Sequence, residues 1–309
     1  MKRQPRVLVV GSINMDLILR TGRVPSRGET ILGKDYQLVP GGKGANQAVA
    51  ASRLGGQVTF VGRIGNDANG ERLMAQFERE GICTDYIKVD ETSNTGLAAI
   101  MLEDSGDNRI IVYSGANMNI SMEDVESALE QDYDVVLLQL EIPDDIVMGT
   151  FKLAKKKGIS VVLDTAPARP LPLENFKGID IISPNETEAT ALTGIEINSF
   201  QSAVQAAKVL QAMCDPKHVV IKMGSKGAMV FDCCSFRHVP SFDVEAVDTT
   251  AAGDAFTAAM ATEYIKGGEI ERAVEFANAV GALTVTKLGA QPSIPTRKEV
   301  DNFIDIKNK

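Results

Sequence analysis

The feature that most constrains the fold is a series of short apolar runs that alternate with amphipathic segments. Continuous apolar runs suit strands that are buried on both faces of a sheet. They lie at residues 7–10, 58–61, 135–138, 161–163, 179–182 and 219–221. Helical patterns separate many of them, at residues 45–54, 70–80, 121–130, 144–157 and 202–213. The alternation implies right-handed crossovers. It predicts an α/β fold with a doubly wound, mostly parallel sheet and helices on both faces.

Two segments depart from this alternation, from residue 16 to about 39 and from 95 to about 113. They predict short strands with no helix between them, at residues 17–19, 30–32, 97–102 and 109–113. Such strands do not fit a doubly wound sheet. We therefore expect a small protruding sheet that serves as a lid or a dimer contact, with two plain surface hairpins as the alternative. The predicted division is a catalytic domain of residues 1–13, 40–94 and 114–309, and a lid subdomain of residues 14–39 and 95–113.

The charge balance bears on possible partners. A net charge of −9 argues against binding nucleic acid or anionic membranes as the main task. A local nest of backbone amides can still bind phosphate on an acidic protein. The sequence contains no run of 18 apolar residues and no signal-peptide pattern, so we expect a cytoplasmic protein without a membrane partner.

A late glycine-centred stretch, DTTAAGD at 248–254, follows a segment at 244–247 that predicts a strand, and it leads into a helix. Small residues at 251–253 let an anion approach the free amides of a first helical turn. The helix dipole favours negative charge there, and so favours Asp254 as a carboxylate, the form that a general base needs. The alternative is an ordinary strand–helix junction with two capping aspartates.

An early stretch, GGKGAN at 41–46, also opens a helix. It is not a P-loop, because Lys43 is followed by glycine, and it lacks the third glycine of a dinucleotide fingerprint. Its paired glycines would let a ligand lie against backbone, with Asn46 one turn in. Asn14 and Asp16 follow the first strand, at the edge where such sheets bind ligands. Asn and Asp together hold vicinal hydroxyls as donor and acceptor, so a polyol fits this corner.

Three weaker patterns accompany these two. NETE at 185–188 could order water around a metal ion, although capping preference alone favours a helix N-cap. GSKG at 224–227 predicts a hairpin turn. GAQPS at 289–293 ends a long helix, whose terminal carbonyls favour cations.

In combination, these motifs resemble the ribokinase-like carbohydrate kinases. The resemblance covers essentially the whole chain and rests on Asn14 with Asp16, GGKGAN at 41–46, QLE at 139–141, NETE at 185–188, DTTAAGDAF at 248–256 and GAQPS at 289–293. It implies transfer of the γ-phosphoryl group of MgATP to a sugar hydroxyl, here the 5-hydroxyl of D-ribose. It further implies activation by K⁺ and a homodimer joined through the lid.

The resemblance also implies site residues. Asp254 would be the base, and the amides of Ala251, Ala252 and Gly253 the anion hole. The sugar site would comprise Asn14, Asp16, Gly42, Lys43, Asn46 and Glu141. Asn185 and Glu188 would act near Mg²⁺ and phosphate, mostly through water; the ATP groove would contain Lys222, Gly224, Ser225, Gly227 and Gly253, with Asn278 near the adenine. K⁺ would be bound, mostly by backbone oxygens, at Asp248, Thr250, Thr284, Lys287, Gly289 and Ser293.

Two residues depart from the family's pattern. Lys222 stands where a small hydroxyl residue is expected beside the phosphates, so its ammonium either contacts phosphate or points into solvent. Pro40 stands before the paired glycines, where an aromatic residue is commoner. The alternatives for function are a kinase of the same family that acts on another sugar or nucleoside, such as deoxyribose, fructose or adenosine, and a non-catalytic sugar-binding regulator.

Overall fold

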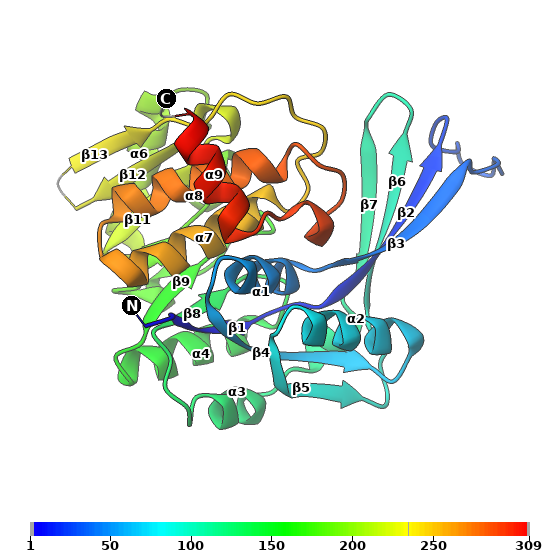
Figure 1. The fold of residues 1–309 in the computed structure, drawn as a ribbon, viewed down its shortest axis with the longest axis horizontal. Helices are drawn as coiled ribbons and strands as arrows, with labels where there is room; N and C mark the ends of the chain where they lie inside the picture. The colour runs from blue at the N-terminus through cyan, green and yellow to red at the C-terminus, as the bar shows by residue number, and fades with distance from the viewer. Residues whose placement is uncertain (1–2, 234, 308–309) are drawn as a thin grey trace.

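The computed structural model of the chain describes residues 3–233 and 235–307. It consists of a nine-stranded sheet covered by helices and a four-stranded sheet that projects from it (Figure 1). The large sheet has the order β13-β12-β11-β10-β9-β8-β1-β4-β5. Its strands are β1 Arg6–Val10, β4 Gln57–Gly65, β5 Cys83–Asp90, β8 Val135–Leu138, β9 Ser160–Leu163, β10 Ile181–Ile182, β11 His218–Lys222, β12 Ala228–Asp232 and β13 Ser235–Val239. Its pairings from β10–β11 through to β4–β5 are parallel, whereas β12 and β13 are antiparallel additions at one edge.

The large sheet is buried on both faces because successive apolar residues of each central strand enter different cores. In β1, Val7 and Val9 belong to one core, and Leu8 and Val10 to the other. Helices that cover the first face are α1 Lys43–Arg53, α2 Ala68–Arg79, α7 Ala252–Gly267, α8 Ile270–Thr284 and α9 Arg297–Lys307. Those on the second face are α3 Met122–Ala128, α4 Asp144–Lys156, α5 Glu186–Thr193 and α6 Phe200–Cys214. The predicted doubly wound fold is confirmed.

The small sheet has the order β3-β2-β6-β7 and projects to the right in Figure 1. Its strands are β2 Asn14–Thr21, β3 Asp35–Gly41, β6 Gly96–Glu103 and β7 Asn108–Tyr113. At its root Asn14 pairs with both Gly41 and Gly96. The sheet therefore begins beside the carboxyl end of β1. Every residue of β7 is exposed, including Ile111 at 66%.

Two predicted strands are wrong. Residues 30–32 lie in a loop, where Leu32 is 92% exposed, and the strand that follows β2 in the small sheet is β3 instead. Residues 244–247 also lie in a loop, which is held by the bond from Val247 N to Val285 O at 2.7 Å. Both segments contain apolar residues typical of strands, but neither takes part in a ladder of either sheet.

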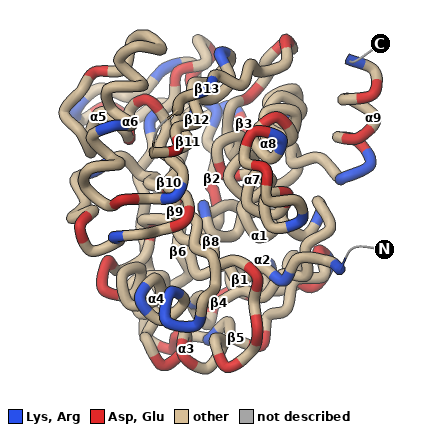
Figure 2. The backbone as a smooth tube through the Cα atoms, turned by 90° about the vertical axis from the view of Figure 1, so that its left-hand side faces the viewer, with Lys and Arg blue, Asp and Glu red and all other residues tan. Residues whose placement is uncertain are grey.

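Short 3₁₀ helices complete the connections: η1 Gly115–Asn119, η2 Leu173–Phe176, η3 Gly224–Lys226 and η4 Gln291–Ser293. Within the described ranges, no helix is long and apolar enough to span a bilayer. Acidic and basic residues are interspersed along the fold, for example red around α3 and blue on α4 in Figure 2. The net charge of −9 is thus distributed over the chain.

Candidate active site

Helix α7 begins in an unusual way. Its N-cap residue, Ala251, has a φ of 61°, a left-handed conformation that residues other than glycine rarely adopt. Within the described part of the chain, no side chain caps this helix start. Ala251, Ala252 and Gly253 line a cavity of about 730 Å³. An uncapped helix start beside a cavity is a ready anion site.

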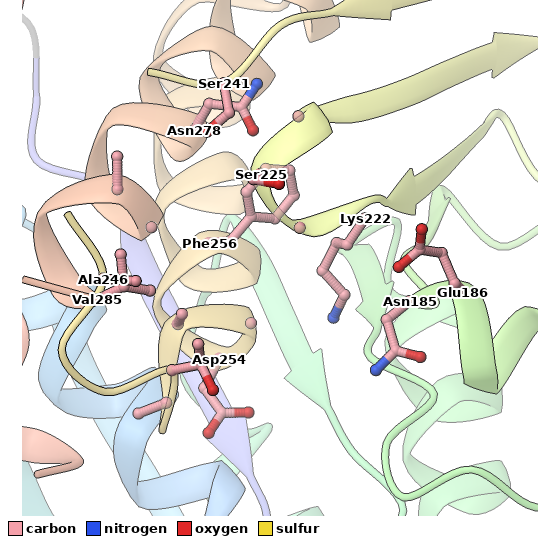
Figure 3. A pocket seen from close by; sticks show the side chains of 18 of the residues that line it. Asn185, Glu186, Lys222, Ser225, Ser241, Ala246, Asp254, Phe256, Asn278 and Val285 are labelled. Carbon is pink, nitrogen blue, oxygen red and sulfur yellow. The ribbon is translucent and has the colours of Figure 1, made fainter. Parts of the chain in front are cut away.

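The cavity extends from Asn278 and Ser241 at one end to Asp254 at the other (Figure 3). Lys222, at the end of β11, and Asn185, before α5, lie across from the start of α7. A second cavity of about 730 Å³ lies between the small sheet and residues 246–250. Thr249 lines both cavities, so they meet beside the start of α7.

Asp254 is buried in the first turn of α7 and accepts a hydrogen bond from Asn46 Nδ2 at 2.8 Å. Burial raises the pKa of Asp254 to about 6, the Lys43 ammonium opposes the rise, and Asp164 adds to it. A carboxyl group with such a pKa is mostly ionised at pH 7, yet it is a stronger base than an exposed aspartate. Oδ1 of Asn46 is buried without a protein partner among the described residues. It is therefore available to a hydroxyl donor.

Gly41 and Gly42, before α1, are required because the chain there lies very close to the start of β2. Gly42 has a φ of 91°, and a Cβ there would lie 2.7 Å from the backbone nitrogen of Asn14. A Cβ at Gly41 would lie 2.2 Å from Oδ2 of Asp16. The two glycines thus bring the first turn of α1, with Lys43, against the start of β2.

The sugar-side residues form a cluster of carboxylates around one ammonium. Glu141 accepts bonds from Ser12 Oγ at 2.6 Å and from the backbone nitrogen of Lys43 at 3.3 Å. Burial, together with the negative charges of Glu141 and Asp254, raises the pKa of Asp16 to about 7, although the Lys43 ammonium opposes the rise. Burial alone would lower the pKa of Lys43, but Asp254 and Glu141 reverse this, so its pKa lies above the usual value. Lys43 therefore stays charged.

The NETE stretch forms a capping box at the start of α5, as capping preference predicted. Asn185 Oδ1 accepts from the Glu188 backbone at 2.8 Å, and Glu188 Oε2 accepts from the Asn185 backbone at 2.9 Å. Both residues also line the first cavity. The described residues include no cluster of three or more His, Cys, Asp or Glu side chains that could hold a metal ion. Mg²⁺ characteristically keeps several waters and binds one or two carboxylates plus phosphates, so this corner fits it through water.

The predicted ATP-groove residues line the far part of the cavity. Gly224, Ser225 and Gly227 lie in the predicted turn that joins β11 to β12. Asn278 on α8 donates to the backbone oxygens of Val239 and Pro240, at 3.0 and 3.1 Å. The groove wall at Asn278 is therefore joined to the end of β13.

The six residues of the predicted cation site divide into two kinds. Asp248 accepts bonds from Thr250 Oγ1 at 2.6 Å and from the Gly289 backbone at 2.9 Å, which joins the loops before α7 and after α8. The other three side chains bond elsewhere: Thr284 to Val280 O, Lys287 to Glu299 and Ser293 to Ala290 O. Those three residues would therefore offer a cation backbone oxygens.

Three residues of the site were missed from the sequence. Asn117 donates to Asn14 Oδ1 at 2.7 Å and accepts from Ile13 N at 2.9 Å, so it orients Asn14. Asp164 directly follows the buried strand β9, and Ser12 lies two residues after the end of β1, positions that could have identified them. Asn117 lies in η1 and carries no comparable local signal.

An uncapped helix start, a buried carboxyl group beside it and a polar corner for hydroxyls are features suited to a sugar kinase. The chain belongs to the pfkB family of carbohydrate kinases, whose pattern matches residues 4–297.

Particular members of the family are similar along the whole chain. The chain is 43% identical to a ribokinase of Haemophilus influenzae, covering 96% of this chain and 97% of that protein. It is 34% identical to a deoxyribokinase of Salmonella typhi, covering 97% and 99%. The structure of Arabidopsis thaliana ribokinase complexed with ribose and ATP superposes with a TM-score of 0.90 at 39% identity, covering 98% and 99%.

Proposed function

We propose that this chain transfers the γ-phosphoryl group of ATP to O5 of D-ribose and yields D-ribose 5-phosphate and ADP. The observation that carries the proposal is Asp254, a buried carboxyl group in the first turn of an uncapped helix, at one end of the first cavity. Full-length similarity to ribokinases supports the choice of sugar.

In the proposed reaction, the carboxylate of Asp254 accepts the proton of the ribose 5-hydroxyl as that oxygen attacks the γ-phosphorus. The bond from phosphorus to the β–γ bridging oxygen breaks, and ADP leaves with its electron pair. The amides at the start of α7 face the charge on the transferring group. Phosphoryl transfer depends mainly on positioning and charge stabilisation, so little more is needed from the protein.

Asn46 orients the base. Its Nδ2 holds Oδ2 of Asp254 at 2.8 Å, which leaves Oδ1 of Asp254 for the hydroxyl. Asn14 and Asp16 are proposed to bind the vicinal hydroxyls as donor and acceptor. Asn117 donates a hydrogen bond to Oδ1 of Asn14. We propose that the Nδ2 donor of Asn14, which this bond leaves free, binds a sugar hydroxyl.

Metal ions complete the proposed site. Mg²⁺, held near Asn185 and Glu188 through water, would supply positive charge to the phosphates. K⁺, held by backbone oxygens near Asp248 and Gly289, would lie between the two loops that Asp248 joins.

The small sheet is proposed to close over the sugar and to form a homodimer. Its outer strand β7 exposes apolar side chains, Ile110, Ile111, Val112 and Tyr113 among them. The second cavity lies beneath this sheet, between Ile18 and Ile100 on one side and Asp248 and Gly289 on the other. We place the reaction in the cytoplasm, where ATP is available.

The experiment is a coupled assay of ADP release with D-ribose, 2-deoxyribose, fructose and adenosine, each with and without K⁺. We expect the highest kcat/KM on D-ribose, and K⁺ should raise it. Fastest turnover on a hexose or nucleoside would overturn the assignment. The 2-deoxyribose arm is the closest comparison, because a deoxyribokinase is 34% identical. Ribose binding by calorimetry with no ADP formed under MgATP and K⁺ would instead identify a sugar-binding regulator.

A further inference from the structure

Lys222 is buried and held in place by two neighbours from other parts of the chain, Asp164 and Thr257. It ends β11 and is 9% exposed, so its ammonium does not point into solvent. Its Nζ donates to Asp164 Oδ1 at 3.0 Å and lies 3.4 Å from Thr257 Oγ1. Oδ2 of Asp164 accepts in turn from Thr257 Oγ1 at 2.9 Å and from Gln47 Nε2 at 3.1 Å. The ammonium is thus held by Asp164, just after β9, and by Thr257 on α7, while Gln47 on α1 holds Asp164.

One side of this ammonium faces the cavity. An ammonium has three N–H donors, and Asp164 and Thr257 take two of them. A Cβ built on Gly253 would lie 3.7 Å from Nζ, so Nζ lies beside the first turn of α7. Lys222 lines the cavity there, and Figure 3 shows its amino group directed into the space between Asn185 and Asp254. The third donor therefore lies where an anion at the helix start would be.

The first cavity is lined by more acidic than basic side chains, so each ammonium in it matters for binding an anion. Among the described residues that line it, Lys43 and Lys222 are the only cationic ones. Acidic lining residues are Asp164, Glu186, Glu188, Asp243 and Asp254. Lys43 lies on the sugar side, against Glu141. A triphosphate that enters from the Asn278 end would therefore meet Lys222 as its cationic side chain.

We propose that Lys222 is a further phosphate-binding residue, whose ammonium contacts the γ-phosphoryl group during transfer, and that Asp164 and Thr257 are the positioning residues that hold it there. This inference rests on the proposed ATP-dependent phosphorylation. The compact charge of lysine suits phosphate, and the shared bond to Asp164 keeps the ammonium in place before the nucleotide arrives. The competing account is that Lys222 only neutralises the buried Asp164.

Nucleotide binding tests the contact without any turnover. Calorimetry would compare wild type with Lys222→Met for ADP and for the non-hydrolysable β,γ-imido analogue of ATP, both with Mg²⁺. Because the variant loses a charge-assisted hydrogen bond, we expect its affinity for the ATP analogue to fall by at least about tenfold. ADP lacks the γ-phosphoryl group, so its affinity should stay within about threefold of wild type on the same reasoning. Equal effects on the two nucleotides, or none on either, would overturn the proposal.

A second pair of variants separates phosphate binding from neutralisation. Lys222→Met leaves Asp164 buried without its cation and should lower the Tm, because an unpaired buried charge is costly. The double variant Lys222→Met with Asp164→Asn removes both charges and should recover much of that Tm. We expect kcat of the double variant to stay at least about tenfold below wild type. Recovery of kcat together with Tm would show that Lys222 acts only as the counter-ion of Asp164.

Lys226→Met is the matched control. Lys226 lies in η3, four residues from Lys222 in the sequence, and its side chain is exposed outside the lining of the cavity. The variant removes the same unit charge, and its analogue affinity and kcat should remain within about twofold of wild type, as for most exposed substitutions. If wild type releases no ADP with ribose, the proposed function fails, while the nucleotide comparison still decides the role of Lys222.

Discussion

Helices α5 and α7 line the same cavity, and each carries an acidic residue in its first turn. In α5 the acid three residues after the N-cap, Glu188, turns back and bonds the backbone of its own N-cap residue, Asn185. In α7 the acid, Asp254, turns to Asn46 on another helix. The same helical position is thus a structural cap in one helix and a candidate base in the other.

The N-cap residue accounts for the difference. Asn185 has an extended conformation and a side chain that accepts from the Glu188 backbone, so α5 satisfies its own first turn. Ala251 offers no side-chain acceptor, and its φ of 61° costs about 1–2 kcal/mol. The start of α7 is therefore left for a ligand at the expense of stability, which is common at functional sites.

The largest expected effect comes from Asp254→Asn. The amide has nearly the same shape and can still accept from Asn46, but it cannot take a proton. We expect kcat to fall at least about a hundredfold, because general bases contribute on that order, with ribose affinity changed little. Steady-state kinetics with a coupled ADP assay and calorimetry with ribose would measure both. Turnover near that of wild type would remove Asp254 from the role of base.

The pH profile gives the next effect. Because burial raises the pKa of Asp254 to about 6, kcat/KM should fall about tenfold per pH unit well below that value as the carboxylate is protonated.

The stability of the fold should depend on pH in the opposite direction. The stabilisation from the protonated form is fully present below the usual aspartate pKa near 4 and is lost as the pH rises through about 6. Asp254→Asn should therefore have a higher Tm than wild type at pH 8, and an equal or lower Tm at pH 8 would contradict this.

A smaller effect is expected at α5. Asn185→Ala removes the side-chain acceptor of the capping box and should cost about 1 kcal/mol of the free energy of unfolding. Denaturant titration would measure it. Glu188→Gln keeps a side chain that can complete the box, so it serves as a control with near-normal stability but a higher requirement for Mg²⁺. If Asn185→Ala were as stable as wild type, the cap would not explain how α5 begins.

The smallest effect is expected from Ala251→Gly. Glycine adopts a positive φ without strain, so the variant should gain up to about 1 kcal/mol of stability, after allowance for its more flexible unfolded chain. Thermal unfolding with kinetics on ribose would test this, and kcat should stay close to that of wild type. A loss of stability would show that Ala251 is not strained.

The sequence predicted the main architecture and the motifs of the site because both depend on local pattern. Runs such as 135–138 became strand β8 over the same residues. Segments 30–32 and 244–247 have the pattern of strands but lie in loops, since strand formation also needs a partner. The left-handed Ala251 has no sequence signal, because alanine seldom adopts that conformation. Lys222 and Asp164 lie 58 residues apart in the sequence. They meet only because β9 and β11 lie on either side of β10 in the sheet, which local sequence pattern does not reveal.

A crystal structure of the protein with D-ribose, Mg²⁺ and the β,γ-imido analogue of ATP tests the central claim most directly. We expect a carboxylate oxygen of Asp254 within about 2.6–3.2 Å of ribose O5, the reach of a general base. The amide of Gly253 should point at the γ-phosphoryl group. A carboxylate that lies out of reach of every ribose oxygen in that complex would contradict the account.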